Sequence, residues 1–486
     1  MSKQIYTFPR FLAVLAIFLH FLNNVQGQSF EATIKIEPGS SKARVEGRFL
    51  GGERPKRLSF LLARGGIAGL GSRISEVTLS NAGQTIGSRR FSDGEYVSDA
   101  DFDNWNFSVD LSPKRPADSA HLSWLSIDRG VLMTDDFLPQ LAGESKAGRV
   151  RFDLPEGWQV VSGGMAGSSD WFPVGDVEDS VFVVGNGWRS RDAAEGKLTF
   201  VTHGQWLFTD EDAAAMAAEV YSEYRKRFGG QPEGVSQIVV SHFPSNVTPG
   251  NWEAETRGNT VLIMSSDMPF ATQSKQRLHE QLRHELFHLW LPNGVNLKGN
   301  YDWFYEGFAL YESLKMAVSL NRIRFEDYLD TLSRARFIAE ASPKRRSLVD
   351  ASNNRFAGSE TELYARGMAT AFLCDLSMIE ASSGKRSVED LLRTVFQKYR
   401  NIQIKPDGSE ALTGVMNEFA ELRPIVERHV KGTDKIDWPS YLGKAGIELR
   451  QDGTAIFVTA KPNKRQKALL DELGYNNWRK LASPTR

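Results

Sequence analysis

The chain has 486 residues, of which 41% are hydrophobic and 24% charged, and its formal net charge is −1. This length leaves room for two or three domains, and the composition excludes a disordered or fibrous chain. The balanced charge provides no basic excess of the kind that binds nucleic acid or an anionic membrane surface.

The first 27 residues are predicted to be a secretory signal peptide. Lys3 and Arg10 precede an apolar run over 11–22, and Val25-Gln26-Gly27 offers small residues for cleavage. The run is too short to span a hydrocarbon core of about 30 Å. We therefore expect a secreted or periplasmic protein without stable membrane insertion, whose mature chain starts near Gln28. An uncleaved signal anchor is the alternative.

Residues 28–205 are predicted to form an antiparallel β domain. Apolar and polar residues alternate over 30–37 and again over 43–49, and the turn sequence Pro38-Gly39-Ser40-Ser41 separates them, which predicts a hairpin. The glycine-rich stretch 65–71 lacks the spacing of a phosphate loop and is interpreted as a turn. Further strands are expected at 121–127, 149–154, 180–185 and 197–203.

Residues 206–450 are predicted to form a second, mainly helical domain. Thr209 can cap a helix over 210–228, which Gly229 ends. Short strands follow at 237–242 and 260–264, and the chain is helical from 272 to about 430. Residues 451–486 form a C-terminal tail with a short strand and a basic helix.

The second domain contains the sequence His284-Glu285-Leu286-Phe287-His288. Residues four apart on a helix lie nearly one above the other, so His284 and His288 can direct two imidazoles at one metal ion. Glu285 can then reach a metal-bound water as a general base. The alternative is a surface helix whose two histidines occur together by chance and bind no metal. The apolar positions Leu282, Leu286 and Leu289 favour an amphipathic helix and hence the metal site.

Glu306 lies downstream in the stretch Trp303-Phe304-Tyr305-Glu306-Gly307, which is predicted to be a second helix. A catalytic zinc site uses three protein ligands and leaves one position open. Glu306 is the natural third ligand, and the sequence predicts a peptidase with one Zn²⁺ per chain.

Together the HELFH and WFYEGFALY segments resemble the gluzincin metallopeptidases, whose third zinc ligand is the Glu of a downstream E-G-F segment. Three further stretches, at 149–163, 364–378 and 430–450, are similar to segments of the glycyl aminopeptidase family, which often carries a PDZ domain. No PDZ-sized region is evident after residue 450. Aminopeptidase N-type enzymes are a more distant resemblance.

The resemblance implies an N-terminal β domain followed by a thermolysin-like catalytic domain that cleaves peptides. It implies that Tyr364 donates a hydrogen bond to the reaction's oxyanion. It also implies that a carboxylate holds the substrate's free amine, for which Glu253 is the choice and Glu255 the second choice. Finally, it implies an edge strand that pairs with the substrate backbone, and residues 259–265 are the candidate.

Three functions remain open on sequence alone: an aminopeptidase, an endopeptidase on the same scaffold, and a non-catalytic peptide-binding protein. Loss of Glu253 should distinguish the first two, and the presence of Glu285 argues against the third. The single cysteine, Cys374, lies among apolar residues and is expected to be buried and inert. No role is assigned to the remaining histidines of the mature chain, His121, His203, His242, His279 and His429.

Overall fold

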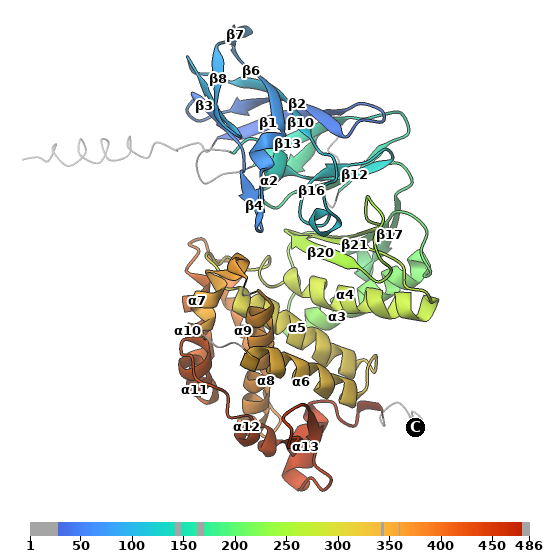
Figure 1. Ribbon diagram of the computed structural model, residues 1–486, viewed down its shortest axis with the longest axis vertical. Helices are drawn as coiled ribbons and strands as arrows, with labels where there is room; N and C mark the ends of the chain where they lie inside the picture. The colour runs from blue at the N-terminus through green and yellow to red at the C-terminus, as the bar shows by residue number, and fades with distance from the viewer. Residues whose placement is uncertain (1–27, 141–146, 163–169, 342–344, 359, 479–486) are drawn as a thin grey trace, which may run out of the picture.

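The structure is a computed structural model that describes residues 28–140, 147–162, 170–341, 345–358 and 360–478. It confirms the predicted fold class, because a β-rich N-terminal half is stacked on a mainly helical half along the long axis of the molecule (Figure 1). The predicted signal peptide lies outside the described residues. Within those residues, none of the helices has the length and apolar character needed to cross a membrane.

The N-terminal half is built on a seven-stranded sheet. The predicted hairpin is its centre, with β1 (Ser29–Ile36) antiparallel to β2 (Lys42–Leu50). The pairing of β1 with β13 is parallel, and the other pairs are antiparallel. In spatial order the strands are β15 (Phe172–Val174), β13 (Gly148–Asp153), β1, β2, β10 (Asn104–Asp110), β6 (Ile74–Asn81) and β7 (Gln84–Ile86).

A four-stranded sheet lies between this sheet and the C-terminal half (Figure 1). Its strand β16 (Val181–Gly185) is buried along its whole length. Phe182 and Val184 pack into the N-terminal core, whereas Val181 and Val183 pack with residues of the sheet below. The other strands are β11 (Trp124–Leu125), β12 (Arg129–Met133) and β14 (Gln159–Val161). This sheet therefore joins the two halves through apolar contacts on both of its faces.

Smaller elements complete the N-terminal half. The glycine-rich stretch forms the tip of a short hairpin, where Gly65 and Gly66 adopt positive φ, so the interpretation as a turn is confirmed. These elements are β3 (Arg57–Ser59), β4 (Ala63–Arg64), β5 (Ile67–Ala68), β8 (Ser88–Ser92), β9 (Glu95–Ser98) and the helical turn α2 (Thr134–Phe137).

The C-terminal half begins with a five-stranded sheet. Its order is β17 (Arg189–Ala193), β18 (Leu198–Thr202), β19 (Ser236–Ser241), β21 (Thr260–Ser265) and β20 (Trp252–Arg257). Sequence analysis ended the N-terminal domain at residue 205, but β17 and β18 precede that residue and pair into this sheet. Strand pairing therefore places the start of the C-terminal half near Arg189.

The edge strand of this sheet differs from the prediction. Residues 259–265 were expected at the edge, but β21 lies between β19 and β20. Its run Val261-Leu262-Ile263-Met264 is buried on both faces, the pattern of an interior strand. The edge strand is β20, which carries polar residues and pairs antiparallel with β21.

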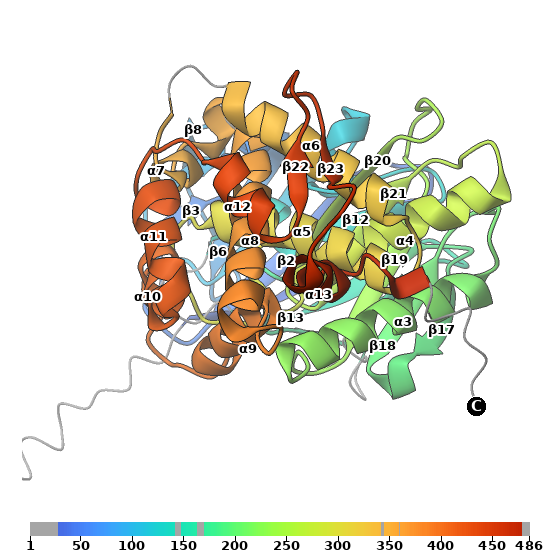
Figure 2. The same cartoon turned by 90° about the horizontal axis from the view of Figure 1, so that it is seen from below.

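Helices fill the rest of the C-terminal half. Thr209 caps α3 (Asp210–Phe228) and Gly229 ends it in the left-handed conformation, as predicted. In Figures 1 and 2, α4 lies on the opposite side of α5 from α10 and α11. Cys374 is buried on α8, as expected. The helices and final strands are α4 (Ala271–His288), α5 (Asp302–Ser319), α6 (Phe325–Ala341), α7 (Leu348–Ser352), α8 (Glu360–Ser382), α9 (Val388–Tyr399), α10 (Gly408–Glu418), α11 (Arg423–Ile425), α12 (Trp438–Lys444), β22 (Ile447–Leu449), β23 (Ile456–Val458) and α13 (Lys464–Glu472).

The helices α5 and α8 cross at two glycines. A Cβ atom on Gly307 would lie 2.4 Å from the Cα of Gly367, and one on Gly367 would lie 2.4 Å from the carbonyl oxygen of Trp303. The backbones thus touch without side chains between them. This crossing sets the separation of Glu306 and Tyr364, which lie beside the two glycines.

We expect Gly367→Ala to lower the free energy of unfolding by about 1–3 kcal/mol, because the added methyl group has to push two backbones apart. Chemical denaturation measures the effect. Gly414→Ala on α10 is the matched control, since a Cβ there meets nothing within 4 Å. The control should raise stability by about 0.4–1 kcal/mol. Equal effects at the two positions would contradict the crossing.

Candidate metal centre and active site

The structure brings His284, His288 and Glu306 together. The Nε2 atoms of the two histidines lie 3.4 Å apart, and the Oε2 atom of Glu306 lies 3.5 Å from His284 Nε2 and 3.7 Å from His288 Nε2. Tetrahedral zinc with ligand bonds of about 2.0–2.1 Å holds neighbouring donor atoms about 3.4 Å apart. The three atoms therefore form one face of a tetrahedron of the size that zinc requires.

The orientation of these side chains also fits a metal. The Nδ1 atom of His288 lies 3.0 Å from the carbonyl oxygen of Leu291, and as the donor it leaves the Nε2 lone pair for a metal. Burial raises the pKa of Glu306, but the neighbouring His284, His288 and Arg355 outweigh burial and lower it to about 2. Glu306 is therefore an ionised ligand. Two imidazoles and one carboxylate are the donor set of a catalytic zinc site with one open position.

Glu285 lies beside this centre and is almost completely buried. The hydroxyl of Thr256 on β20 is 3.0 Å from its Oε2 atom and 3.1 Å from its backbone carbonyl oxygen. Thr256 thus links the edge strand to the predicted general base and orients its carboxylate. Sequence analysis did not identify Thr256, because the contact joins residues that are far apart along the chain.

Arg355 is a second residue that sequence analysis missed. Its guanidinium lies 2.6 Å from Asp302 Oδ1, 3.4 Å from Glu306 Oε1 and 2.8 Å from Glu360 Oε1. It therefore holds the Glu306 oxygen that is turned away from the two histidines. The same guanidinium lies 5.1 Å from the centroid of the Tyr364 ring.

Tyr364 lies next to the centre, near the start of α8. Its hydroxyl is directed at Glu360 Oε1, at a distance of 3.3 Å. Burial raises the pKa of the phenol, and the negative charge of Glu306 raises it further. Tyr364 therefore stays protonated and able to donate a hydrogen bond.

The two candidate amine ligands, Glu253 and Glu255, differ sharply in their surroundings. Glu255 accepts from Arg257 Nε at 2.7 Å and from Arg64 Nη2 at 3.2 Å, and His121 Nδ1 lies 2.6 Å from it. The Glu253 side chain is 38% exposed and has His121 Nε2 at 3.7 Å. Glu255 is thus committed to three cationic partners, and Glu253 is the carboxylate open to a ligand.

No protein-family model matches the sequence, and the search of curated proteins found no match. Solved structures do match. An aminopeptidase N family protein from Idiomarina loihiensis has a TM-score of 0.74 at 14% identity, covering 90% of this chain and 82% of its own. An M1 zinc metallopeptidase from Deinococcus radiodurans has a TM-score of 0.56 at 17% identity, covering 85% and 96%.

Yeast LTA4 hydrolase also matches, with a TM-score of 0.50 at 14% identity, covering 93% of this chain and 71% of its own. The fold is therefore the two-domain fold of M1 zinc metallopeptidases. One of these neighbours belongs to the aminopeptidase N family, which sequence analysis gave as the more distant resemblance.

We expect the purified chain to bind one zinc ion and His288→Ala to bind it more than about 100-fold more weakly. Loss of a mere hydrogen-bond partner of a metal ligand weakens binding about 10–100-fold, and loss of the ligand should cost more. Titration of the metal-free protein with zinc measures both affinities. His242→Ala is the control, because His242 stacks on Trp206 away from the three ligands. Equal affinity in wild type and His288→Ala would contradict the site.

Proposed function

We propose that this chain is a zinc-dependent aminopeptidase that removes N-terminal residues from peptides. The observation that supports it best is the convergence of His284, His288 and Glu306 in zinc geometry, with Glu285 alongside. A protein that only bound peptides would have no use for a buried, oriented Glu285. The M1-type fold supports the same function.

The chain's residues divide the chemistry among them. Zinc held by the three ligands would supply Lewis-acid polarisation of the scissile carbonyl and lower the pKa of water. Glu285 takes a proton from the attacking water and passes it to the leaving amine. Tyr364 turns its hydroxyl from Glu360 to the oxyanion that develops on the substrate, and such a donor lowers the barrier by about 3–4 kcal/mol.

Peptide binding would use β20. An edge strand offers backbone N–H and C=O groups that pair with an extended peptide whatever its sequence. Glu253 near the start of this strand would hold the substrate's ammonium group through charge-assisted hydrogen bonds. A mutant of the Deinococcus radiodurans enzyme has been crystallised bound to a Tyr-Ser-Ala substrate, which supports a peptide ligand for this fold.

The proposed compartment is the periplasm or the cell exterior. Its support is the apolar run 11–22 with Lys3 and Arg10 before it, the layout of a signal peptide. Cell fractionation and N-terminal sequencing of the exported protein test it. An N-terminus near Gln28 is the expected result, and retention in the membrane fraction would indicate a signal anchor instead.

Glu285→Gln should lower the rate of hydrolysis by about 10²–10⁴-fold at unchanged zinc content, because the amide cannot accept the proton of water. A panel of aminoacyl substrates and their N-blocked counterparts measures it. Hydrolysis of unblocked substrates alone supports the aminopeptidase. Cleavage of blocked peptides would indicate an endopeptidase, and zinc binding without turnover would indicate a peptide-binding protein.

Thr256→Val should lower kcat about 10–100-fold with little change in KM, since a hydrogen bond to a charged group contributes about 1.5–3 kcal/mol. Thr256→Ser keeps the hydroxyl and should retain most of the activity. Steady-state kinetics of the two variants separate positioning of Glu285 from simple packing. An equal loss in both variants would contradict the positioning role.

A further inference from the structure

A loop of the N-terminal half meets the outward face of β20. Alternate residues of a strand point to the same side, so Glu253, Glu255 and Arg257 share one face. His121 approaches that face, with Nδ1 at 2.6 Å from Glu255 Oε2 and Nε2 at 3.7 Å from Glu253 Oε2. The imidazole of His121 thus lies between Glu253, the candidate amine ligand, and Glu255, which is already paired with arginines.

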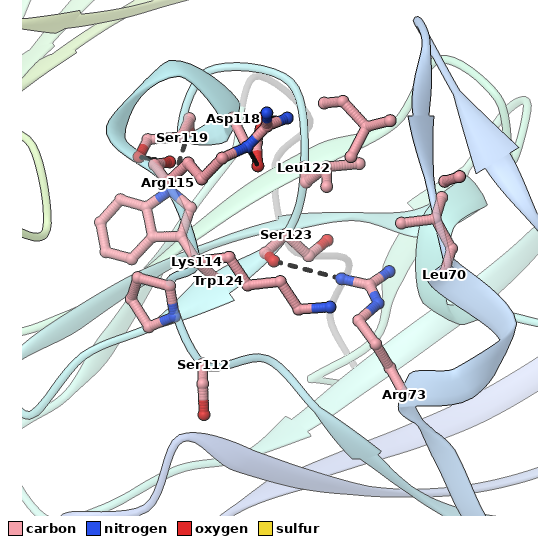
Figure 3. Close-up of a pocket in the computed structure, with 13 residues that line it drawn as sticks. Leu70, Arg73, Ser112, Lys114, Arg115, Asp118, Ser119, Leu122, Ser123 and Trp124 are labelled. Carbon is pink, nitrogen blue, oxygen red and sulfur yellow. Dashed lines mark hydrogen bonds and ion pairs between the residues drawn. The ribbon is translucent and has the colours of Figure 1, made fainter.

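The loop that carries His121 is held firmly. Figure 3 shows two contacts of this loop. Arg115 pairs with Asp118, which precedes His121 in sequence, and Arg73 donates to Ser123, which follows it. Arg115 makes a bidentate pair with Asp118, at 2.9 and 2.6 Å, and Arg73 reaches the Ser123 carbonyl at 3.5 Å. From β20, Arg257 donates to the carbonyl oxygen of His121 at 2.8 Å. The position of the imidazole is therefore set by the fold.

The hydrogen bonds also determine that the Nδ1 atom of His121 carries a proton. Glu255 is ionised, because Arg257, His121 and Arg64 outweigh its burial and hold its pKa well below the usual range. An ionised carboxylate accepts, so His121 must donate its Nδ1–H to Glu255. The Nε2 atom then faces Glu253 either as N–H⁺ or, once deprotonated, as a hydrogen-bond acceptor.

Without a ligand the ring is charged. Burial lowers the pKa of His121, but the carboxylates of Glu253 and Glu255 outweigh it and raise the pKa to about 9. His121 also lines an open pocket between the two halves of the molecule. The other charged residues of that pocket are Arg115, Asp118, Arg355 and Glu360. Arg355 also contacts Glu306, so this pocket lies beside the metal centre.

We propose that Glu253 and the Nε2 atom of His121 together bind the substrate's N-terminal ammonium group, and that binding expels the proton from Nε2 into solvent. The ammonium group has three N–H donors, so it can bond both the carboxylate and the freed lone pair. Its positive charge takes the place of the imidazolium, and the net charge of the site is unchanged. This inference rests on the proposed aminopeptidase function. It adds His121 to the residues that bind the amine, and it adds the release of a proton on binding.

The exchange makes affinity depend on pH. While free His121 is protonated and the ligand's amine, of pKa about 7.7–8.0, is charged, one proton leaves per ligand bound. Affinity should therefore rise towards tenfold per pH unit between about pH 6 and pH 7.5 and level off as the amine itself deprotonates.

Calorimetric titration of leucinamide into the zinc-loaded Glu285→Gln chain tests the proposal without turnover. We expect close to one proton released per ligand, measured as the dependence of the binding heat on the buffer's ionisation enthalpy. Acetyl-leucinamide, which lacks the ammonium group, should not bind. In the same background, His121→Gln should bind leucinamide without proton release, because the amide N–H can bond Glu255 while its oxygen accepts from the ammonium.

His203→Gln is the matched control, since His203 is a partly buried histidine that stacks on Trp188 far from β20 in sequence. It should leave proton release unchanged. Failure of leucinamide to bind, binding without proton release, or release that persists in His121→Gln would overturn the proposal. An active aminopeptidase without proton release contradicts only this inference. Absence of hydrolysis by the wild type, with proton-linked binding intact, contradicts only the proposed function.

Discussion

The candidate active site depends on the contact between two helices that supply opposite sides of one metal centre. α4 presents two imidazoles one turn apart, and α5 must bring a carboxylate within 3.7 Å of both. His288 and Glu306 are buried and His284 is partly buried, and polar groups at this distance are costly to assemble unless a metal or a proton satisfies them. The glycine crossing of α5 with α8 fixes the backbone beside Glu306 and brings Tyr364 towards it, so the packing and the candidate site are set by the same backbone contact.

The second constraint is the union of the two halves. The strand β16 is buried on both faces and joins the N-terminal core to the five-stranded sheet through apolar contacts. The two halves are also joined by an ion pair, in which the guanidinium of Arg257 on β20 lies 2.5 Å from the carboxylate of Asp135 on α2, and both residues are buried. Removing one partner of such a buried pair leaves an uncompensated charge and strongly destabilises the protein. The pair therefore helps to fix the orientation of one half on the other. The N-terminal half therefore contributes to the proposed substrate site, because it places His121 and Arg64 over the edge strand.

Local patterns predicted much of this structure. The β1–β2 hairpin, the capped helix α3, the helix α4 that carries His284 and His288, and the tail of strand and helix all follow from periodicity and capping, which act over a few residues. The grouping of His284, His288 and Glu306 was equally accessible, since a helical repeat brings the first two together and a second motif supplies the third. The edge strand was predicted wrongly because the choice between β20 and β21 depends on what lies beside each strand, and that is a nonlocal property.

The sequence by itself determined the fold class, and it predicted the candidate metal ligands and the candidate general base, because each of these depends on residues that are close along the chain. Only the tertiary structure decided which of Glu253 and Glu255 is open to a ligand, because the cations that occupy Glu255 come from β4, β20 and the loop of His121. It likewise brought Thr256 to Glu285 and Arg355 to Glu306. Apart from the contact of Arg257 with Glu255 within β20, these contacts join residues separated by tens to hundreds of positions, and long-range pairing leaves no periodic signal in the sequence.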